Sequence, residues 1–443
     1  MSSQLIAHPG GPLRGEIPLP GDKSISHRAV IFGSLAEGES RIHHLLEGED
    51  VLRTVAAFRA MGVDARREPG GVWRIRGVGL DGLSEPGDVL DMGNSGTGMR
   101  LLAGLLAGQP FFSVLTGDDS LRGRPMGRVA VPLVRMGARI LGRDNNRCAP
   151  LAIQGTELIG IDYLSPVASA QVKTAVLLAG LTASGRTSVS EPALSRDHTE
   201  RMLTAFGVPV ERDGLIVSVT GRPRLQGLEL TVPGDISSAA FPMVAALLVP
   251  DSEVTLIGVG INPSRTGLLD LLLAMGADIE LLNARDAGGE PVADLRVRHS
   301  RLRGIRVAPE VVPRAIDEFP IFALAAACAE GETLVTGAEE LRVKESDRIH
   351  AIALGLGRQG ARIEELPDGL RIQGRPEGLE GGSVAEAFGD HRVAMTLMVS
   401  GLAAARAVTV RGRANVETSF PGFADTMGIL GGRIERVAGE KES

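Results

Sequence analysis

The chain has 443 residues, which is enough for two or three domains with sizeable cores. Its formal net charge of −7 argues against non-specific nucleic-acid binding, which needs a broad basic face, and its 3% aromatic content argues against base stacking. Two cysteines are too few for a disulfide framework, and the apolar runs are too short to span a bilayer. We therefore expect a cytoplasmic protein without nucleic-acid or membrane partners.

Two sequence patterns alternate along the chain. The first is a polar loop, a small-residue apolar helix and a β-rich run, and it starts near residues 21, 93, 167, 233, 315 and 389. The second is an amphipathic helix that ends in a capping glycine and leads into a strand. These glycines are Gly62, Gly137, Gly207, Gly276, Gly360 and Gly431. Because both patterns recur six times in the same order, they predict a small αβ module used six times.

Six modules predict an α/β fold of two lobes, each built from three repeated αβ units. The tripeptide Pro-Gly-Asp opens the first and the fourth module. We therefore expect that residues 1–20 and 235–443 form lobe one and that residues 21–234 form lobe two. Two linkers that cross at one place make a hinge, which we place near 20–22 and 233–236. A cleft between two lobes is a usual ligand site.

The polar loops that open the first-pattern helices carry most of the candidate binding groups. In chain order they offer Lys23, Ser24 and Arg28; Asn94, Gly96 and Arg100; Ser169, Gln171 and Lys173; Asp317 and Glu318; and Asp390, His391 and Arg392. The fourth loop has no cation. Helix N-termini present free N–H groups and a partial positive charge, so loops of this kind that converge would bind an anion.

Three charged clusters lie outside these loops. They contain Arg122, Arg124 and Arg128; Arg196, Asp197 and His198; and Lys344, Glu345 and Arg348. In the last cluster a helix would place Lys344 and Arg348 on one face, and Glu345 would lie close enough to pair with Arg348. Taken alone, each cluster is also compatible with a capped or solvated helix start.

Several enzyme classes lack their motifs in this chain. It has no P-loop, no dinucleotide fingerprint, no His-Glu-x-x-His and no Cys-x-x-Cys, so neither a cofactor nor a metal is indicated. Arginines and lysines with a few carboxylates remain. This combination suits phosphate- and carboxylate-bearing substrates and acid–base chemistry.

Nine motifs occur in a familiar order: PGDKSISHRA, GNSGTGMRLL, RPM, SAQVKTA, SRDHTERM, IDEFP, LRVKESDRI, DHRVAM and TSFPGF. With them the chain resembles the 5-enolpyruvylshikimate-3-phosphate synthase family, in the second of its two bacterial subgroups. The resemblance implies two lobes that close over the substrates. It also implies transfer of the enolpyruvyl group of phosphoenolpyruvate to the 5-hydroxyl of shikimate 3-phosphate, with release of phosphate, through a tetrahedral intermediate. This reaction belongs to the shikimate pathway of chorismate and aromatic amino-acid biosynthesis.

The resemblance also implies roles for individual residues. Shikimate 3-phosphate would be bound by Lys23, Ser24, Arg28, Ser169, Gln171, Arg196, Asp317 and Lys344. Phosphoenolpyruvate would be bound by Lys23, Gly96, Arg124, Gln171, Arg348 and Arg392. Asp317 is the candidate base for the 5-hydroxyl, Glu345 would exchange a proton with the methylene carbon, and Lys23 would assist the departing phosphate. Since Gly96 leaves room in the phosphoenolpyruvate site, we expect competitive inhibition by glyphosate.

The chain departs from the better-known subgroup at two places. Thr418 and Ser419 stand where that subgroup has a lysine, and Glu340 replaces an asparagine, so neither role is carried over. One alternative is the related transferase that acts on UDP-N-acetylglucosamine, but that family has a cysteine shortly before the arginine matching Arg124, and this chain has none there. Another alternative is a non-catalytic anion-binding repeat protein. We expect a monomer.

Overall fold

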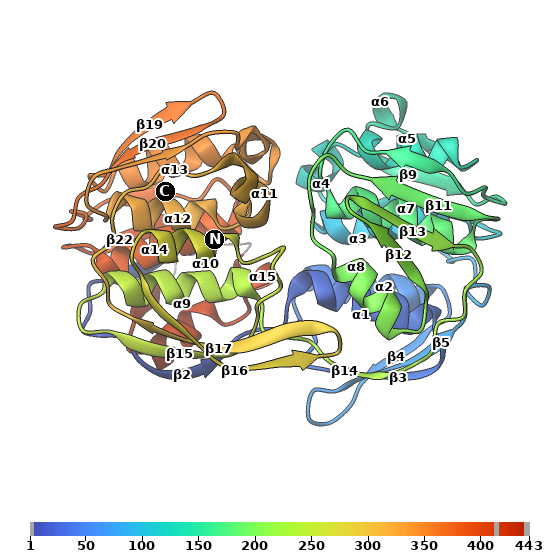
Figure 1. The fold of residues 1–443 in the computed structure, drawn as a ribbon, viewed down its shortest axis with the longest axis horizontal. Helices are drawn as coiled ribbons and strands as arrows, with labels where there is room; N and C mark the ends of the chain where they lie inside the picture. Colours follow the sequence, from blue (N-terminus) through green and yellow to red (C-terminus); the bar gives the residue numbers. More distant parts are fainter. Residues whose placement is uncertain (1–3, 412–415, 438–443) are drawn as a thin grey trace, which may run out of the picture. The chain divides into compact units, whose positions relative to one another are not determined.

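Six small sheets are formed by the residues that the computed structural model describes, 4–411 and 416–437 (Figure 1). Five of these sheets have four strands and one has three. In every four-stranded sheet one edge strand is parallel to its neighbour, and the two central strands are antiparallel. The shared topology confirms the predicted αβ module.

Residue contacts divide the chain into two units. Unit 1 comprises the described residues of Met1–Pro20, Gly234–Arg285 and Pro291–Ser443, and unit 2 comprises Gly21–Pro233 and Asp286–Glu290. Residues 286–290, which the sequence-based division assigns to lobe one, therefore belong with unit 2, and Gly234, which it assigns to lobe two, belongs with unit 1. The predicted ends of lobe one, 1–3 and 438–443, lie outside the described residues, as do residues 412–415.

Unit 2 holds the first three modules. Its helices are α1 (Lys23–Leu35), α2 (Glu49–Ala60), α3 (Gly96–Leu106), α4 (Asp119–Gly123), α5 (Gly127–Arg135), α6 (Arg143–Asn146), α7 (Ala170–Thr182) and α8 (His198–Ala205). The strands form the orders β14-β3-β5-β4, β6-β7-β9-β8 and β10-β11-β13-β12. Their bounds are β3 (Glu37–His43), β4 (Asp64–Arg67), β5 (Trp73–Val78), β6 (Leu90–Asp91), β7 (Phe112–Thr116), β8 (Arg139–Gly142), β9 (Cys148–Gln154), β10 (Asp162–Leu164), β11 (Arg186–Ser190), β12 (Val210–Asp213), β13 (Ile216–Thr220) and β14 (Glu229–Thr231).

Unit 1 holds the other three modules. Its helices are α9 (Ile236–Leu248), α10 (Gly267–Ala274), α11 (Val312–Ala315), α12 (Phe319–Ala327), α13 (Arg348–Gly357), α14 (His391–Ala403), α15 (Val416–Ser419), α16 (Phe423–Ile429) and the 3₁₀ turns η1 (Pro309–Val311) and η2 (Glu339–Val343). The strands form the orders β16-β17-β15-β2, β18-β20-β19 and β21-β22-β1-β23. Their bounds are β1 (Gln4–His8), β2 (Arg14–Pro18), β15 (Glu253–Gly260), β16 (Asp278–Ala287), β17 (Glu290–Arg298), β18 (Glu332–Val335), β19 (Arg362–Leu366), β20 (Gly369–Gln373), β21 (Val384–Glu386), β22 (Val408–Arg411) and β23 (Arg433–Val437).

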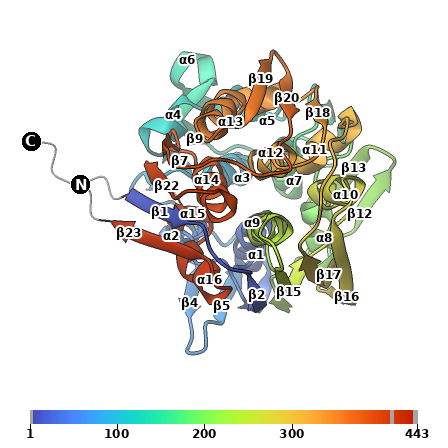
Figure 2. The same ribbon diagram turned by 90° about the vertical axis from the view of Figure 1, so that its left-hand side faces the viewer.

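The first residues of the chain complete two sheets of unit 1. Figure 2 shows β1 between β22 and β23, and β1 pairs antiparallel with both. Strand β2 pairs parallel with β15. The chain then passes into unit 2 after Pro20 and returns after Pro233. The two passages lie side by side, because the Asp22 N–H donates to the Pro233 carbonyl (2.8 Å) and the Asp235 N–H donates to the Pro20 carbonyl (2.9 Å).

The second-pattern helices end as the sequence predicts. The six glycines that follow α2, α5, α8, α10, α13 and α16 all have positive φ, between 86° and 106°. Glycine adopts this left-handed conformation without the clash that a Cβ would cause. Each module therefore turns from its helix into the next strand at a glycine.

The first-pattern helices are buried, and they pack against one another inside each unit. Helix α3 contacts α1 and α7, while α9, α12 and α14 contact one another. All nine residues of α12 are buried, as expected for a helix that is apolar all round. Helices α3 and α7 approach closely at Gly104, where an added Cβ would lie 2.2 Å from the Ala175 carbonyl oxygen.

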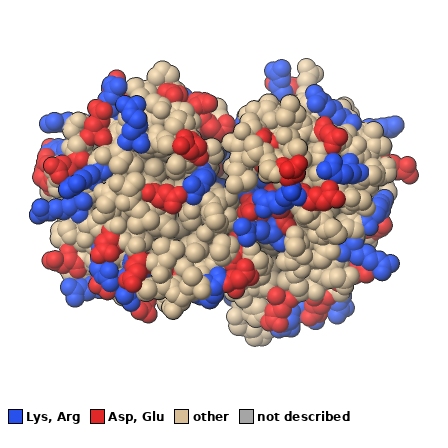
Figure 3. Space-filling view, viewed as in Figure 1, with Lys and Arg blue, Asp and Glu red and all other residues tan. Residues whose placement is uncertain are grey.

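Each unit has a hydrophobic core of its own. One cluster of buried residues runs from Ile25 to Val232, and the other is made by residues between Leu5 and Leu19 and between Ile236 and Leu430. None of the helices in the described part of the chain is long and apolar enough to cross a membrane. On the face drawn in Figure 3, Lys and Arg side chains alternate with Asp and Glu over each unit.

Candidate active site

The start of α1 places Lys23 and Arg28 in unit 2. Asp22 caps this helix by accepting a hydrogen bond from the Ile25 N–H (2.8 Å). Lys23, whose side chain is 21% exposed, forms an ion pair with Asp50 of α2. This contact holds the ammonium group at the helix start, beside the anion-attracting N–H groups.

Arg28 is almost fully buried, and its hydrogen bonds go to uncharged oxygens. The guanidinium donates to Thr199 (2.8 Å), to Thr174 (2.8 Å) and to the Ser24 carbonyl (2.9 Å). These partners fix the group without neutralising it. Such a buried cation attracts an anion, especially a phosphate that can accept several charge-assisted hydrogen bonds.

Electrostatics link Arg28 to Arg196. Burial lowers the pKa of Arg28 to about 10, the carboxylates of Glu200 and Asp22 act against this shift, and the charge of Arg196 adds to it. Two arginines that repel each other across a site are stabilised when an anion binds there.

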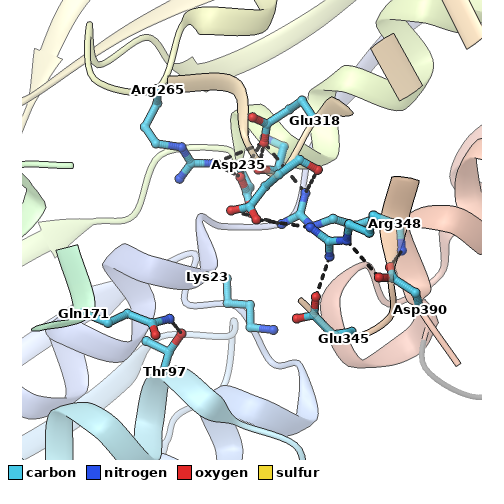
Figure 4. A network of polar contacts seen from close by, with 12 residues as sticks. Lys23, Thr97, Gln171, Asp235, Arg265, Glu318, Glu345, Arg348 and Asp390 are labelled. Atoms are coloured by element: carbon cyan, nitrogen blue, oxygen red, sulfur yellow. Dashed lines mark hydrogen bonds and ion pairs between the residues drawn. The ribbon is translucent and has the colours of Figure 1, made fainter. Parts of the chain in front are cut away.

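The start of α7 carries Ser169 and Gln171. Ser169 is the N-cap residue, and its own N–H donates to Glu191 (3.0 Å). The Gln171 amide oxygen accepts from Arg100 (2.5 Å), and its amide nitrogen donates to Thr97 (3.0 Å), as Figure 4 shows for the second contact. The starts of α3 and α7 are therefore tied together through Gln171.

Gly96 is the first residue of α3 and lies next to two guanidinium groups. A Cβ added there would lie 3.2 Å from Nη1 of Arg124 and 3.3 Å from Nη1 of Arg100. Arg124 also donates to the Asn94 side chain (2.5 Å), and the Gly96 N–H donates to the Asn94 carbonyl (3.0 Å). The structure therefore joins Gly96 and Arg124, which the resemblance places in one site. It adds Arg100, a candidate of the same polar loop to which the resemblance assigns no role.

In unit 1, Arg348 lies at the centre of a carboxylate cluster (Figure 4). Its side chain is fully buried and contacts Glu345 (2.6 Å), Asp390 (2.8 Å) and Asp317 (3.4 Å). Burial alone would lower the pKa of Arg348, but Asp390, Glu345 and Asp317 outweigh it and raise the pKa. Burial alone would likewise raise the pKa of Asp390, but Arg348 keeps it below its usual value.

The two candidate catalytic carboxylates thus share one buried cation. The side chains of Asp317 and Glu345 are 18% and 25% exposed, so each keeps an open edge. Asp317 lies just before α12, and Glu345 lies between η2 and α13. The contact between Glu345 and Arg348 confirms the pairing that their spacing predicts.

The predicted helical face that would join Lys344 to Arg348 is wrong. Helix α13 begins at Arg348, because Asp347 caps it by accepting from the His350 N–H (3.1 Å), and Lys344 lies outside the helix at the end of η2. Burial lowers the pKa of Lys344, Arg348 acts in the same direction, and the carboxylates of Asp317, Glu340 and Glu345 oppose the shift.

Arg392 is the second residue of the neighbouring helix α14 and faces the same cluster. Asp390 caps this helix and accepts from the Arg392 N–H (2.9 Å). The Arg392 guanidinium donates to the Asp317 carbonyl (3.3 Å) and lies 3.7 Å from Glu318. The structure therefore brings together the predicted residues Asp317, Glu345, Arg348 and Arg392.

The sequence does not predict that a cation from outside the fourth polar loop contacts residues of that loop. Arg265 is buried, donates to the Ser237 hydroxyl (2.6 Å) and lies 3.7 Å from Glu318 and 3.6 Å from Asp235 (Figure 4). The fourth loop itself has no cation, and the lone arginine in the segment after β15 gives no local sign of this role.

Ser419, which stands near the position of the missing lysine, is buried at the end of α15. Among residues 4–411 and 416–437, no group of three or more His, Cys, Asp and Glu side chains could hold a metal ion.

Comparisons with known proteins agree on one family. The model of the family described as EPSP synthase (3-phosphoshikimate 1-carboxyvinyltransferase) matches residues 7–427. The 3-phosphoshikimate 1-carboxyvinyltransferase of Magnetococcus marinus is 62% identical over 439 residues, covering 97% of this chain and 99% of its own. That of a Geobacter species is 57% identical over 428 residues, covering 97% and 98%.

Solved structures give the same result. EPSP synthase from Acinetobacter baumannii matches with a TM-score of 0.90 and 48% identity over 99% of this chain and 100% of its own. The enolpyruvyl transferase NikO from Streptomyces tendae matches with a TM-score of 0.80 over 99% and 100%, and at 18% identity it shows likeness of fold alone. The family match and the highly identical relatives, both over nearly the whole chain, show that this chain belongs to the EPSP synthase family.

Proposed function

We propose that the cationic residues of unit 2 and the Arg348 cluster of unit 1 act on one pair of substrates. As a member of its family, the enzyme transfers the enolpyruvyl group of phosphoenolpyruvate to shikimate 3-phosphate in aromatic biosynthesis. The observation that carries the assignment of roles is the buried Arg348, which holds Asp317 and Glu345 together at partly open positions.

Shikimate 3-phosphate is bound by residues from both units. They are Lys23, Ser24, Arg28, Ser169, Gln171 and Arg196 from unit 2, and Asp317 and Lys344 from unit 1. The buried Arg28 supports this proposal, because its hydrogen bonds to uncharged oxygens leave its charge for a phosphate.

Phosphoenolpyruvate is bound by a second set of residues. They are Lys23, Gly96, Arg124 and Gln171 from unit 2, and Arg348 and Arg392 from unit 1. The guanidinium of Arg124 next to the start of α3 supports this set, since a helix start and an arginine both favour a phosphate. Glyphosate competes with phosphoenolpyruvate for this site.

The reaction then proceeds by addition and elimination. Asp317 removes the proton of the 5-hydroxyl as its oxygen forms a bond to C2 of phosphoenolpyruvate, and Glu345 donates a proton to the methylene carbon. The bond between C2 and the phosphate oxygen of the resulting tetrahedral intermediate then breaks, and Glu345 takes a proton back from the methyl carbon. The phosphate leaves with the proton that Asp317 removed. Lys23 stabilises the charge on the departing phosphate. We also propose that the enzyme acts as a cytoplasmic monomer without nucleic-acid or membrane partners, in keeping with its net charge of −7.

The experiment is phosphate release from phosphoenolpyruvate with and without shikimate 3-phosphate, for the wild type and Asp317→Ala. We expect release that depends on shikimate 3-phosphate and falls by about 10²–10⁴-fold in the variant. The control is Asp270→Ala, which removes a half-exposed carboxylate of α10 that pairs with Arg314 (2.6 Å). Equal rates in the two variants would contradict the role of Asp317. Release with UDP-N-acetylglucosamine instead would favour the related transferase, and no release with either acceptor would favour an anion-binding protein.

A further inference from the structure

A buried lysine between two buried glutamates lies behind the start of α7 in unit 2. The ammonium of Lys173 lies 3.0 Å from Glu191 and 2.8 Å from Glu200, and all three side chains are at most 3% exposed. Buried charges persist only when they are paired, so each glutamate needs this lysine. Lys173 is a sequence candidate from the polar loop that opens α7, but the structure places it inside α7, with its charge paired inside the protein.

Glu191 makes two contacts that Glu200 does not share. One of its oxygens accepts from the Ser169 backbone N–H (3.0 Å), and the other accepts from the Ser195 hydroxyl (2.8 Å). Ser169 is the N-cap residue of α7, and Ser195 directly precedes Arg196. A single carboxylate therefore holds two segments, each carrying a residue proposed to bind shikimate 3-phosphate.

Glu200 provides the comparison within the same cluster. Besides Lys173 it lies near Arg212 (4.0 Å), and it raises the pKa of Arg28. It has the same buried charge partner as Glu191 but lacks the contacts to Ser169 and Ser195.

We propose that Glu191 is a positioning residue for shikimate 3-phosphate. It fixes the backbone of Ser169 and the segment of Arg196 in the geometry that the substrate requires, and Lys173 holds the carboxylate in place. Glu191 acts through Ser169 and the segment of Arg196. Since both residues are proposed to bind shikimate 3-phosphate and neither to bind phosphoenolpyruvate, its effect is on shikimate 3-phosphate. The inference rests on the substrate-binding roles proposed above for Ser169 and Arg196.

The sign of the effect separates positioning from simple electrostatics. Replacing either glutamate by glutamine removes a negative charge from the cluster around Lys173, which by itself would favour binding of an anion such as the phosphate. A weaker interaction with shikimate 3-phosphate in Glu191→Gln alone is therefore the signature of lost positioning. We expect its KM for shikimate 3-phosphate to rise about tenfold, with kcat and the KM for phosphoenolpyruvate within about twofold of wild type, since a hydrogen bond to a charged group contributes on this scale.

The matched controls are Glu200→Gln and a pair of serine variants. Glu200→Gln should not raise the KM for shikimate 3-phosphate. Ser195→Ala removes only the hydroxyl that donates to Glu191 and should raise this KM about three- to tenfold. Ser188→Ala removes a hydroxyl of similar burial that donates to Asp162 and should leave it unchanged. If a glutamine variant does not fold, as judged by circular dichroism, the serine pair decides.

Two outcomes would overturn the inference, and one further variant identifies which proposal fails. Equal increases in the KM for shikimate 3-phosphate in Glu191→Gln and Glu200→Gln would show that Glu191 does not position the site. An unchanged KM in Ser195→Ala would show the same. Arg196→Gln tests the underlying role. If Arg196→Gln raises the KM for shikimate 3-phosphate while the other variants do not, only the positioning inference is wrong. If Arg196→Gln leaves this KM unchanged, the binding role of Arg196 and the inference are both wrong.

Discussion

Gly96, at the start of α3, lies so close to Arg124 and Arg100 that one added carbon atom would crowd both guanidinium groups. The Cβ of Gly96→Ala would lie 3.2 Å from Nη1 of Arg124, so the guanidinium must shift by a few tenths of an ångström. We expect a several-fold higher KM for phosphoenolpyruvate, an inhibition constant for glyphosate raised by about tenfold or more, and an unchanged KM for shikimate 3-phosphate. Steady-state kinetics with each substrate varied in turn measure all three.

The control for this prediction is Gly428→Ala in α16, where an added Cβ would have no neighbour within 4 Å. Its kinetics should match the wild type. Unchanged glyphosate inhibition in Gly96→Ala, or a wild-type inhibition constant above the millimolar range, would contradict the proposed place of glyphosate.

His27 makes the folded state sensitive to acid. Burial lowers its pKa from 6.5 to about 3, Asp50 opposes the shift, Lys23 and Arg28 add to it, and Asp22 opposes it. Between these two pKa values the unfolded chain binds a proton that the folded chain does not, so stability falls as the pH falls. From pH 7 to pH 5 this group should cost about 2 kcal/mol of unfolding free energy.

The test is urea unfolding of the wild type and His27→Asn at pH 7 and pH 5. The variant lacks this titration, so acidification should destabilise it by about 2 kcal/mol less than the wild type. Equal losses in the two proteins would show that His27 is protonated without cost in the fold.

At this scale the sequence predicts contacts between near neighbours and misses distant ones. The pairing of Glu345 with Arg348 follows from their spacing on the chain. Asp390 also contacts Arg348, but it lies 42 residues away in the sequence, and no local pattern around either residue predicts this contact. The same holds for Arg265 and Glu318, which meet only because the fold buries both.

At the scale of elements, the close approach of α3 and α7 is set by Gly104. In Gly104→Ala the new Cβ would lie 2.2 Å from a backbone oxygen of Ala175, so the helices must move apart. Overpacking of this kind costs about 1–3 kcal/mol. Because Arg100 of α3 donates to Gln171 of α7, we also expect a higher KM for phosphoenolpyruvate.

Urea unfolding and steady-state kinetics measure these two effects. Gly357→Ala is the control, since it lies at the end of α13 with no neighbour within 4 Å of an added Cβ, and it should change stability by less than about 1 kcal/mol. A Gly104→Ala variant as stable as this control would mean that the two helices can separate freely.

The elements themselves are well predicted because their signals are local. Six glycine caps and six apolar helices follow from residues within one turn or one face, and the structure confirms them. The error at Lys344 arises where two local signals compete. The spacing to Arg348 favours one helix, but the Asp347 cap starts the helix after Lys344.

At the scale of the whole molecule, residues 286–290 show what the sequence does not reveal. Glu290 and His198 are both buried and lie 2.8 Å apart, and the Gly289 carbonyl accepts from Arg201 (2.9 Å). These contacts join residues about ninety positions apart in the sequence. They are made by the turn between β16 and β17, and no repeated sequence pattern marks that turn. The repeats therefore predict the division into lobes, but they do not predict that residues 286–290 belong with unit 2.

The division of the cores predicts that unit 2 can fold without the rest of the chain. All members of its hydrophobic cluster lie between Ile25 and Val232. A fragment of residues 21–233 should therefore unfold cooperatively in urea. The fragment should be less stable than unit 2 is in the whole protein, where residues 286–290 are present. Loss of Glu290 leaves the buried His198 without this partner, at a cost of about 1–3 kcal/mol.

A fragment of residues 234–443 is the matched comparison, and it should not fold cooperatively. It lacks β1, a central strand that pairs with both β22 and β23, and it lacks β2, which pairs with β15. Without β1 the sheet loses its middle, and apolar residues between Leu5 and Leu19 are missing from the core. Circular dichroism during urea unfolding measures both fragments. A cooperative transition for 234–443, or none for 21–233, would mean that the two cores do not define the folding units.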